Sequence, residues 1–370
     1  MAFLDINDNR AFNNIHEFVD FLCTERDLTD FKRKLHVVGA ISKFESLRYF
    51  KESLRRFKFG IDNEYGNLLL ISKKVKDTES VFYVYVFFDD RNNIPLFFTQ
   101  GRKSDEIPTT IIKYISRTKN ITHLWIGPHT LKKIKDELLD KYPDSKISYF
   151  TGKNFTSKTL NEGTGSLVRP DIKRLIRYKG RDGKETLEEF ETIYGIFPRV
   201  IEFELSNGLG FRIDNKGIVT LNYGNFRDVF QILQDDVIRK IEVVRQAVNQ
   251  SEYTITEIQT KSGNMFERPI QKPWSIQLAK PLDFGVAKKA LIKLEEDEWN
   301  FTVFNEVLME GSVYLSARLV DNNKHSKFEI LSAGEKINIY PIDNVDIGSA
   351  ITFFAFVSEN IDPQAIPIIQ

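Results

Sequence analysis

Residues 81–88 read VFYVYVFF, and this stretch decides what fold we expect for the N-terminal half of the chain. LLLIS at 68–72 precedes it and PLFFTQ at 95–100 follows it. Short apolar runs rich in aromatic and β-branched residues, bounded by turn residues, are typical of buried strands. The sequence therefore predicts a sheet in this region.

Helical patterns alternate with further strand patterns in the next stretch of the chain. Residues 107–117 precede the run ITHLWIG at 121–127, and residues 130–142 precede KISYFTG at 146–152. Strands that alternate with helices of this length are typical of crossover connections between parallel strands. We therefore expect the sheet to be at least partly parallel.

The remaining segments complete an expected α+β, multidomain architecture. The first 60 residues have helical patterns, and three short strands with Gly-containing turns are expected within 199–224, before a helix that starts near Asn225 and ends near Gln250. Short alternating runs after residue 253, among them ALIKLEE at 290–296 and ITFFAFVS at 351–358, indicate an antiparallel sandwich or barrel. The expected parts are a helical plus α/β domain at 1–154, a linker at 155–168, a basic segment plus β-β-β-α unit at 169–252, and an antiparallel β domain at 253–370.

Composition excludes several classes of protein. Lys plus Arg and Asp plus Glu each total 52, so the formal net charge is zero and a polyanion could bind only to a local basic patch. The single cysteine, Cys23, excludes an internal disulfide framework, and the five histidines lack metal-ligand spacing. The chain shows neither a membrane-length apolar stretch nor a signal-peptide pattern. We expect a cytoplasmic protein without a metal or cofactor.

Glycine and basic residues follow three of the strands expected in the N-terminal half. If those strands are parallel, their ends meet at one sheet edge, where open α/β sheets bind ligands. Glycine lets a phosphate approach the backbone, and the free N–H groups at a helix start favour anions. None of the three turns matches a Walker or dinucleotide-binding motif. We expect phosphate contacts there from Arg102, Lys103, His129 and Lys153.

A basic stretch from Thr151 to Lys184 is the second candidate site. It has nine basic and three acidic residues, a net charge of +6 in a chain whose total is zero. Tyr178 lies within it, so a base could stack there while phosphates pair with the cations. The expected contacts are Arg169, Lys173, Arg174, Arg177 and Lys179.

These features favour a non-catalytic protein that binds DNA or RNA through a local basic surface, as part of a larger complex. One alternative is an interaction subunit, with a protein partner or a second copy of the chain covering the same surface. Another is a regulator that senses a nucleotide at the sheet edge. The last is a divalent-metal nuclease, for which Glu202 or Glu204 with Asp214 and Lys216 supplies the residue types, although 214–217 also forms a good turn sequence.

Overall fold

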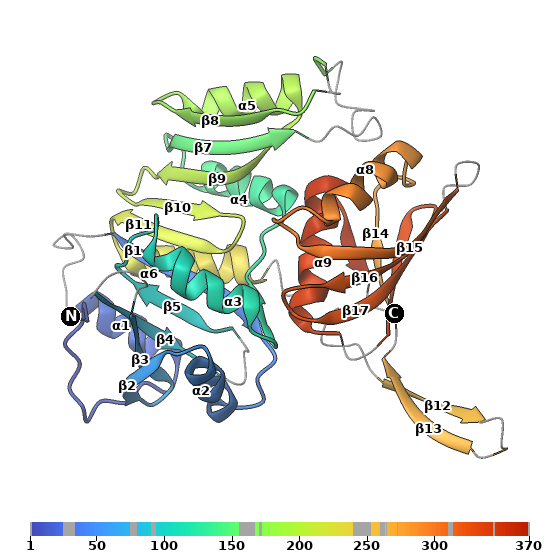
Figure 1. Ribbon diagram of the computed structural model, residues 1–370. Coiled ribbons are helices and arrows are strands. Elements are labelled where there is room, and N and C mark those ends of the chain that lie inside the picture. Colours follow the sequence, from blue (N-terminus) through green and yellow to red (C-terminus); the bar gives the residue numbers. More distant parts are fainter. Residues whose placement is uncertain are drawn as a thin grey trace. The chain divides into compact units, whose positions relative to one another are not determined.

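The computed structural model describes residues 2–24, 34–74, 80–89, 94–154, 167–169, 172–239, 253–259, 263, 265–271, 273–309, 314–342 and 345–368. The chain divides into two compact units (Figure 1). Unit 1 is Met1–Asn154 with Lys173–Ile241, and unit 2 is Phe155–Ile172 with Glu242–Gln370. The expected α+β, multidomain class is confirmed.

Unit 1 is built on one large sheet, with eleven strands among the described residues. Every strand pairing described in it is antiparallel. In spatial order the strands are β2 (Gly60–Tyr65), β3 (Leu68–Lys74), β4 (Val81–Phe87), β5 (Leu96–Thr99), β1 (Leu35–Ser42), β11 (Ile218–Tyr223), β10 (Gly210–Asp214), β9 (Ile196–Glu204), β7 (Lys146–Asn154) and β8 (Leu175–Lys179), with β6 (Ile121–His123) paired to the end of β1 (Figure 1).

Helices cover both faces of this sheet. The helical segments of unit 1 are α1 (Ile15–Thr24), α2 (Leu47–Arg56), η2 (Pro108–Ile112), α3 (Lys113–Arg117), α4 (Pro128–Lys141), α5 (Gly183–Tyr194), α6 (Phe226–Ile232) and η4 (Leu233–Ile238), of which the two η segments are π-helical. Phe97 of β5 contacts Phe50 of α2 and Tyr114 of α3 on one face. Its neighbour Phe98 contacts Phe18 of α1 and Phe226 of α6 on the other. The core of unit 1 therefore has an apolar layer on each side of β5.

Two sequence-based expectations for unit 1 are wrong. The sheet is not partly parallel, because its strands pair antiparallel even where helices connect them. The first 60 residues are not wholly helical either, since β1 lies in the middle of the sheet. Every residue of β1 is buried, so its sequence LHVVGAIS lacks the alternation that marks a half-exposed strand.

The middle segment does not form a separate β-β-β-α unit. β11 pairs with β1 and β9 pairs with β7, so both expected domains contribute strands to one sheet. The sequence patterns predicted neither β8, which lies within the basic stretch 151–184, nor α5, most of which follows it. The expected helix is described as α6 and η4 up to residue 239, and its continuation to residue 250 lies outside the described residues. Most of the expected linker at 155–168 also lies outside them.

Unit 2 contains an antiparallel sheet, as expected, but with two helices that were predicted as strands. Its six-stranded sheet has the order β15 (Phe301–Met309), β16 (Tyr314–Asp321), β17 (Ser326–Ala333), β18 (Lys336–Pro341), β14 (Trp274–Gln277) and β19 (Ile366–Ile368), beside a hairpin of β12 (Tyr253–Gln259) and β13 (Met265–Gln271). Residues 290–294 of the ALIKLEE run belong to α8 (Phe284–Leu294), and the whole ITFFAFVS run belongs to α9 (Ile347–Asn360). Phe353 of α9 packs on Phe328 of β17, which places α9 against the sheet.

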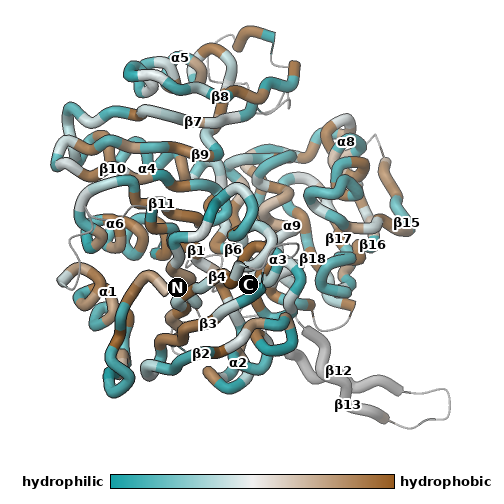
Figure 2. Tube along the Cα trace, turned by 60° about the vertical axis from the view of Figure 1, so that its left-hand side comes forward, coloured by the Kyte–Doolittle hydropathy of each residue, from teal (hydrophilic) through white to brown (hydrophobic). Residues whose placement is uncertain are grey.

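Figure 2 colours the first half of β3 as hydrophobic and most of β2, at the sheet edge, as hydrophilic. Among the helices that the structure describes, none is both long and apolar enough to cross a lipid bilayer.

Candidate functional site

Two adjacent rows of side chains cross the sheet of unit 1 and differ sharply in chemistry. Residues directly opposite each other on neighbouring strands point to the same face, and successive residues along a strand alternate between faces. The apolar row is Tyr178, Phe150, Ile201, Ile213, Val219, Val37 and Phe98. The polar row beside it is Lys179, Tyr149, Glu202, Arg212, Thr220, His36 and Thr99. One side of the sheet therefore carries a continuous polar row from β8 to β5, which we call the polar face; farther along β5 the same side is apolar, where Phe97 packs on α2 and α3.

Helices α4 and α5 cover the β7–β9 end of the apolar row, and α1 and α6 cover its β5 end. Phe150 of β7 contacts Phe190 of α5, with 6.3 Å between the ring centroids. Lys135 of α4 donates to Glu191 of α5 at 2.9 Å, which ties the two helices together on this face. The polar row points to the opposite face, and at β8 its cations reach solvent: Arg177 and Lys179 are both exposed.

Two arginine side chains lie close to one aromatic ring on the polar face. The Arg212 guanidinium lies 4.5 Å from the centroid of the Tyr149 ring, and the Arg177 guanidinium lies 5.5 Å from the same centroid. Arg212 also forms an ion pair with Glu202 on the neighbouring strand. Both guanidinium groups thus lie within cation–π distance of the same ring.

The polar row ends in a hollow of about 440 Å³ where β1, β5, β10 and β11 meet. Among the described residues that line it, four are cationic and none is acidic. The lining residues are Lys34, His36, Gln100, Gly101, Arg102, Lys103, Arg212, Thr220 and Asn222. His36 and Thr220 are buried and form a hydrogen bond between Nδ1 and Oγ1 at 2.9 Å. This volume lies within the range of small-molecule sites.

The electrostatics of the hollow disfavour additional positive charge. Burial, together with the cations Lys103, Lys34 and Arg212, lowers the pKa of His36 from 6.5 to about 4. His36 is therefore neutral at pH 7, and its ring can accept or donate a hydrogen bond according to its tautomer. Burial disfavours a charge of either sign, whereas the nearby cations Lys103, Lys34 and Arg212 disfavour only positive charge and would attract an anion.

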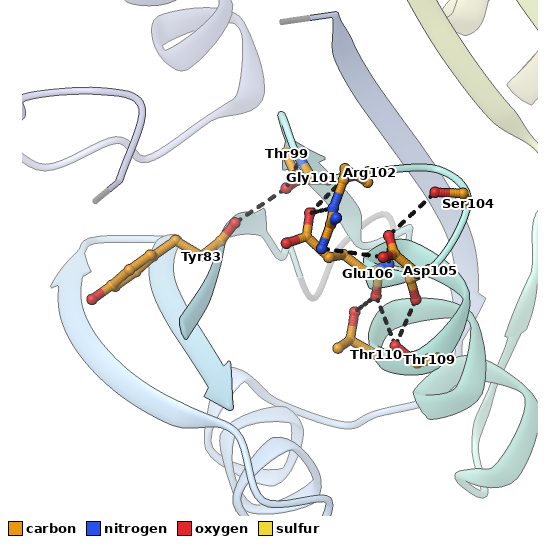
Figure 3. A network of polar contacts seen from close by, with 9 residues as sticks. All are labelled: Tyr83, Thr99, Gly101, Arg102, Ser104, Asp105, Glu106, Thr109 and Thr110. Carbon is orange, nitrogen blue, oxygen red and sulfur yellow. Dashed lines mark hydrogen bonds and ion pairs between the residues drawn. The ribbon is translucent and has the colours of Figure 1, made fainter. Parts of the chain in front are cut away.

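Arg102 and its acidic neighbours fix the turn that follows β5 (Figure 3). The Arg102 guanidinium lies 3.1 Å from Asp105 Oδ2 and 3.6 Å from Glu106 Oε2, and its backbone N–H donates to Glu106 Oε2 at 2.6 Å. Gly101 N–H donates to Thr99 Oγ1 at 3.0 Å, at the end of the strand. The turn is thus built by short-range polar contacts, and Arg102 contributes to its structure as well as to the wall of the hollow.

Lys103 links this turn to the end of β10. Its Nζ lies 3.0 Å from Asp214 Oδ2, and Asp214 Oδ1 accepts the backbone N–H groups of Lys216 and Ile218. Residues 214–217 form the expected turn, closed by the Gly217 N–H to Asp214 carbonyl bond at 3.0 Å. Two of the three carboxylates considered for a nuclease site, Asp214 and Glu202, therefore pair with cations from neighbouring segments.

Comparison with known proteins places the chain in a family. A family model described as AF_0896_M, family middle domain, matches residues 129–216. An uncharacterized protein of Archaeoglobus fulgidus is 30% identical over 360 residues, which cover 94% of this chain and 94% of that protein. The chain belongs to the same family as this archaeal protein. No solved structure matches the chain.

The part matched by the AF_0896_M family model runs from α4 to the turn after β10. This part includes one half of the polar row, namely Lys179, Tyr149, Glu202 and Arg212. His36 and Thr220 lie outside it. In the structure this part shares the sheet of unit 1 with strands from both sides of the match.

The structure brings together some of the sequence-predicted site residues and separates others. Arg102 and Lys103 line the hollow, and Arg177 and Lys179 lie at the exposed end of the polar row. The expected meeting of three turns at one edge is wrong: β7 runs in the opposite direction to β5 and β6, so their ends lie at opposite edges.

The remaining predicted residues lie elsewhere or take part in packing. His129 is in the first turn of α4 and does not line the hollow, and Lys153 lies within β7, not after it. Arg174 lies 4.8 Å from the Tyr194 ring centroid. Lys173 is exposed just before β8, and Arg169 belongs to unit 2.

Sequence reasoning missed Lys34, His36, Tyr149 and Arg212, which complete the site. Their only signal in the sequence was alternation, as in the FRID run at 211–214, where a cation falls between two buried apolar residues. Which strand each residue would lie beside could not be read from that pattern.

Proposed function

We propose that unit 1 binds nucleic acid without catalysis, through the polar face that runs from β8 to the hollow. The observation that carries this proposal is the arrangement of Lys179, Arg177, Tyr149 and Arg212, in which cations flank one aromatic ring. Proteins that bind single strands without sequence preference combine a cationic track with aromatic side chains on which bases stack. A reducing compartment such as the cytoplasm suits the single cysteine.

The dimensions of the face set the length of the bound strand. Neighbouring strands lie about 4.8 Å apart, so the five steps from β8 to β1 span about 24 Å. A nucleic-acid strand rises about 3.4 Å per nucleotide when stacked, which gives roughly seven nucleotides across the face. An oligonucleotide of about twelve residues is therefore long enough to test the proposal.

The test is fluorescence anisotropy with single- and double-stranded DNA and RNA oligonucleotides between about 50 and 200 mM salt, with and without Mg²⁺. The variants are Arg177→Ala and Lys179→Ala, both at exposed positions that can change without loss of fold. Lys133→Ala and Lys141→Ala on α4 are the matched controls, because α4 packs on the other face.

We expect the wild type to bind single strands and each β8 variant to bind all sequences more weakly. Each lost phosphate contact lowers the slope of log affinity against log salt by about 0.7 for a single strand. The α4 variants should retain the wild-type slope. The proposal is overturned if the wild type does not bind at low salt, or if the β8 variants behave like the α4 controls. Mg²⁺-dependent cleavage of an oligonucleotide would instead favour the alternative function of a divalent-metal nuclease.

A further inference from the structure

Two residues that line the hollow at the end of the polar row each have a buried amide atom without a partner in the described part of the chain. Gln100 Nε2 and Asn222 Oδ1 are both buried and have no hydrogen-bond partner among the residues that the structure describes. A buried polar atom without a partner costs about 1–3 kcal/mol, so such atoms are rare unless a ligand satisfies them. Gln100 Nε2 is a hydrogen-bond donor, and Asn222 Oδ1 is an acceptor.

The charges around these atoms suit an anion. Lys34, Lys103 and Arg212 line the same hollow. The carboxylates that pair with Lys103 and Arg212, those of Asp214 and Glu202, are not lining residues. An anion in the hollow would thus contact the cations without facing either carboxylate.

The shape of the hollow bears on whether it binds the middle or the end of a nucleic-acid strand. Thr220 and His36, which belong to the sheet itself, are buried and line the hollow together with the cations. A continuous strand would pass over this floor, whereas a terminal group can enter. A terminal phosphate monoester carries a charge of about −1.5 to −2 at pH 7 and offers three acceptor oxygens to Lys, Arg and amide donors.

We propose that the hollow binds the phosphate monoester of a nucleoside, with Lys34, Lys103, Arg212 and Gln100 Nε2 contacting the phosphate and Asn222 Oδ1 accepting a hydrogen bond from the sugar or base. An acceptor needs a donor in the ligand, and a nucleoside supplies one as a hydroxyl or amino group. The source is either the end of a strand on the polar face, which rests on the proposed function, or a free mononucleotide.

The experiment compares oligonucleotides of about twelve residues that carry a 5′-phosphate, a 3′-phosphate or only hydroxyl ends, together with AMP and inorganic phosphate in thermal-shift assays. The variants are Gln100→Leu and Asn222→Leu. Both replace a side chain whose amide atom has no partner in the described structure, so neither removes a protein hydrogen bond at that atom. Arg177→Ala is the control on β8.

We expect one phosphorylated end to bind about tenfold more tightly than hydroxyl ends, and both Leu variants to lose this preference while they still bind hydroxyl-ended strands. Arg177→Ala should weaken both kinds of strand and keep the preference. If AMP stabilises the protein but no oligonucleotide binds, the proposed phosphate site in the hollow is supported and the proposed function fails.

If all ends bind equally and AMP has no effect, the proposed phosphate site is overturned while the proposed function stands. Equal stabilisation by inorganic phosphate and AMP would overturn the nucleoside part of the proposal.

Discussion

At the scale of single residues, His36 makes the stability of unit 1 depend on pH. Its pKa falls from 6.5 to about 4 on folding, first because it is buried and then because Lys103, Lys34 and Arg212 lie near it. Between these two values the unfolded chain binds a proton that the folded chain does not. Stability from neutral His36 is therefore present above about pH 6.5 and is lost as the pH falls toward 4.

This effect can be measured by urea unfolding at about pH 7.5 and about pH 5.5. We expect the wild type to lose about 1 kcal/mol more than His36→Gln over this interval, because glutamine does not titrate and can still bond to Thr220. An equal loss in the two proteins would show that His36 is not the titrating group. An NMR titration of the folded protein that finds His36 charged at the lower pH would contradict its lowered pKa and therefore this prediction.

Local clustering of charge along the sequence predicted part of the candidate site correctly. Arg102, Lys103, Arg177 and Lys179 were selected because basic residues gathered locally along the chain, and they do lie on the polar face. Arg212 could not be selected in this way, because it approaches Tyr149 only through the pairing of β7, β9 and β10. Local sequence does not specify which strands become neighbours in space.

At the scale of elements, one buried ammonium group joins α4 to α5. Lys135 Nζ lies 2.9 Å from Glu191 Oε1, and its side chain is 1% exposed. Lys132 binds the same carboxylate at 2.7 Å, but its side chain is 33% exposed. Loss of a buried ion pair costs more than loss of an exposed one, although Glu191 keeps Lys132 as a partner when Lys135 is replaced.

We expect Lys135→Met to lower the free energy of unfolding by about 2 kcal/mol, as measured in urea. Lys132→Met is the control on the same helix and should cost about 1 kcal/mol or less, since water screens an exposed pair. Equal effects of the two substitutions would contradict the buried role of Lys135. The test is independent of any ligand, because both residues lie on the face opposite the polar row.

The errors in assigning elements also have physical causes. ITFFAFVS in α9 is apolar on nearly every side, and such a run does not distinguish a buried strand from a buried helix. The helix signal was Asp346, whose side chain accepts the Gly348 N–H at 2.8 Å as an N-cap. In β1 the cause was the same, because a strand that is buried on both faces does not alternate.

At the scale of the whole molecule, residues 1–154 should not fold alone. In that fragment β7 would lose both of its neighbours, β8 and β9, and β1 would lose β11. We expect no cooperative thermal transition for 1–154 by circular dichroism, and a cooperative transition for 1–241, which retains every strand of the large sheet. A dispersed NMR spectrum and a cooperative transition from 1–154 would restore the domain boundary that the sequence suggested.

The central claim is that nucleic acid lies on the polar face of unit 1 and not on the face covered by α4 and α5. Lysine footprinting tests it most directly: the protein is acetylated with and without a single-stranded oligonucleotide, and modification at each lysine is measured by mass spectrometry. We predict slower modification of Lys34, Lys103 and Lys179 in the complex, with unchanged rates at Lys133 and Lys141. Protection of Lys133 and Lys141, with Lys179 and Lys34 unchanged, would contradict the account.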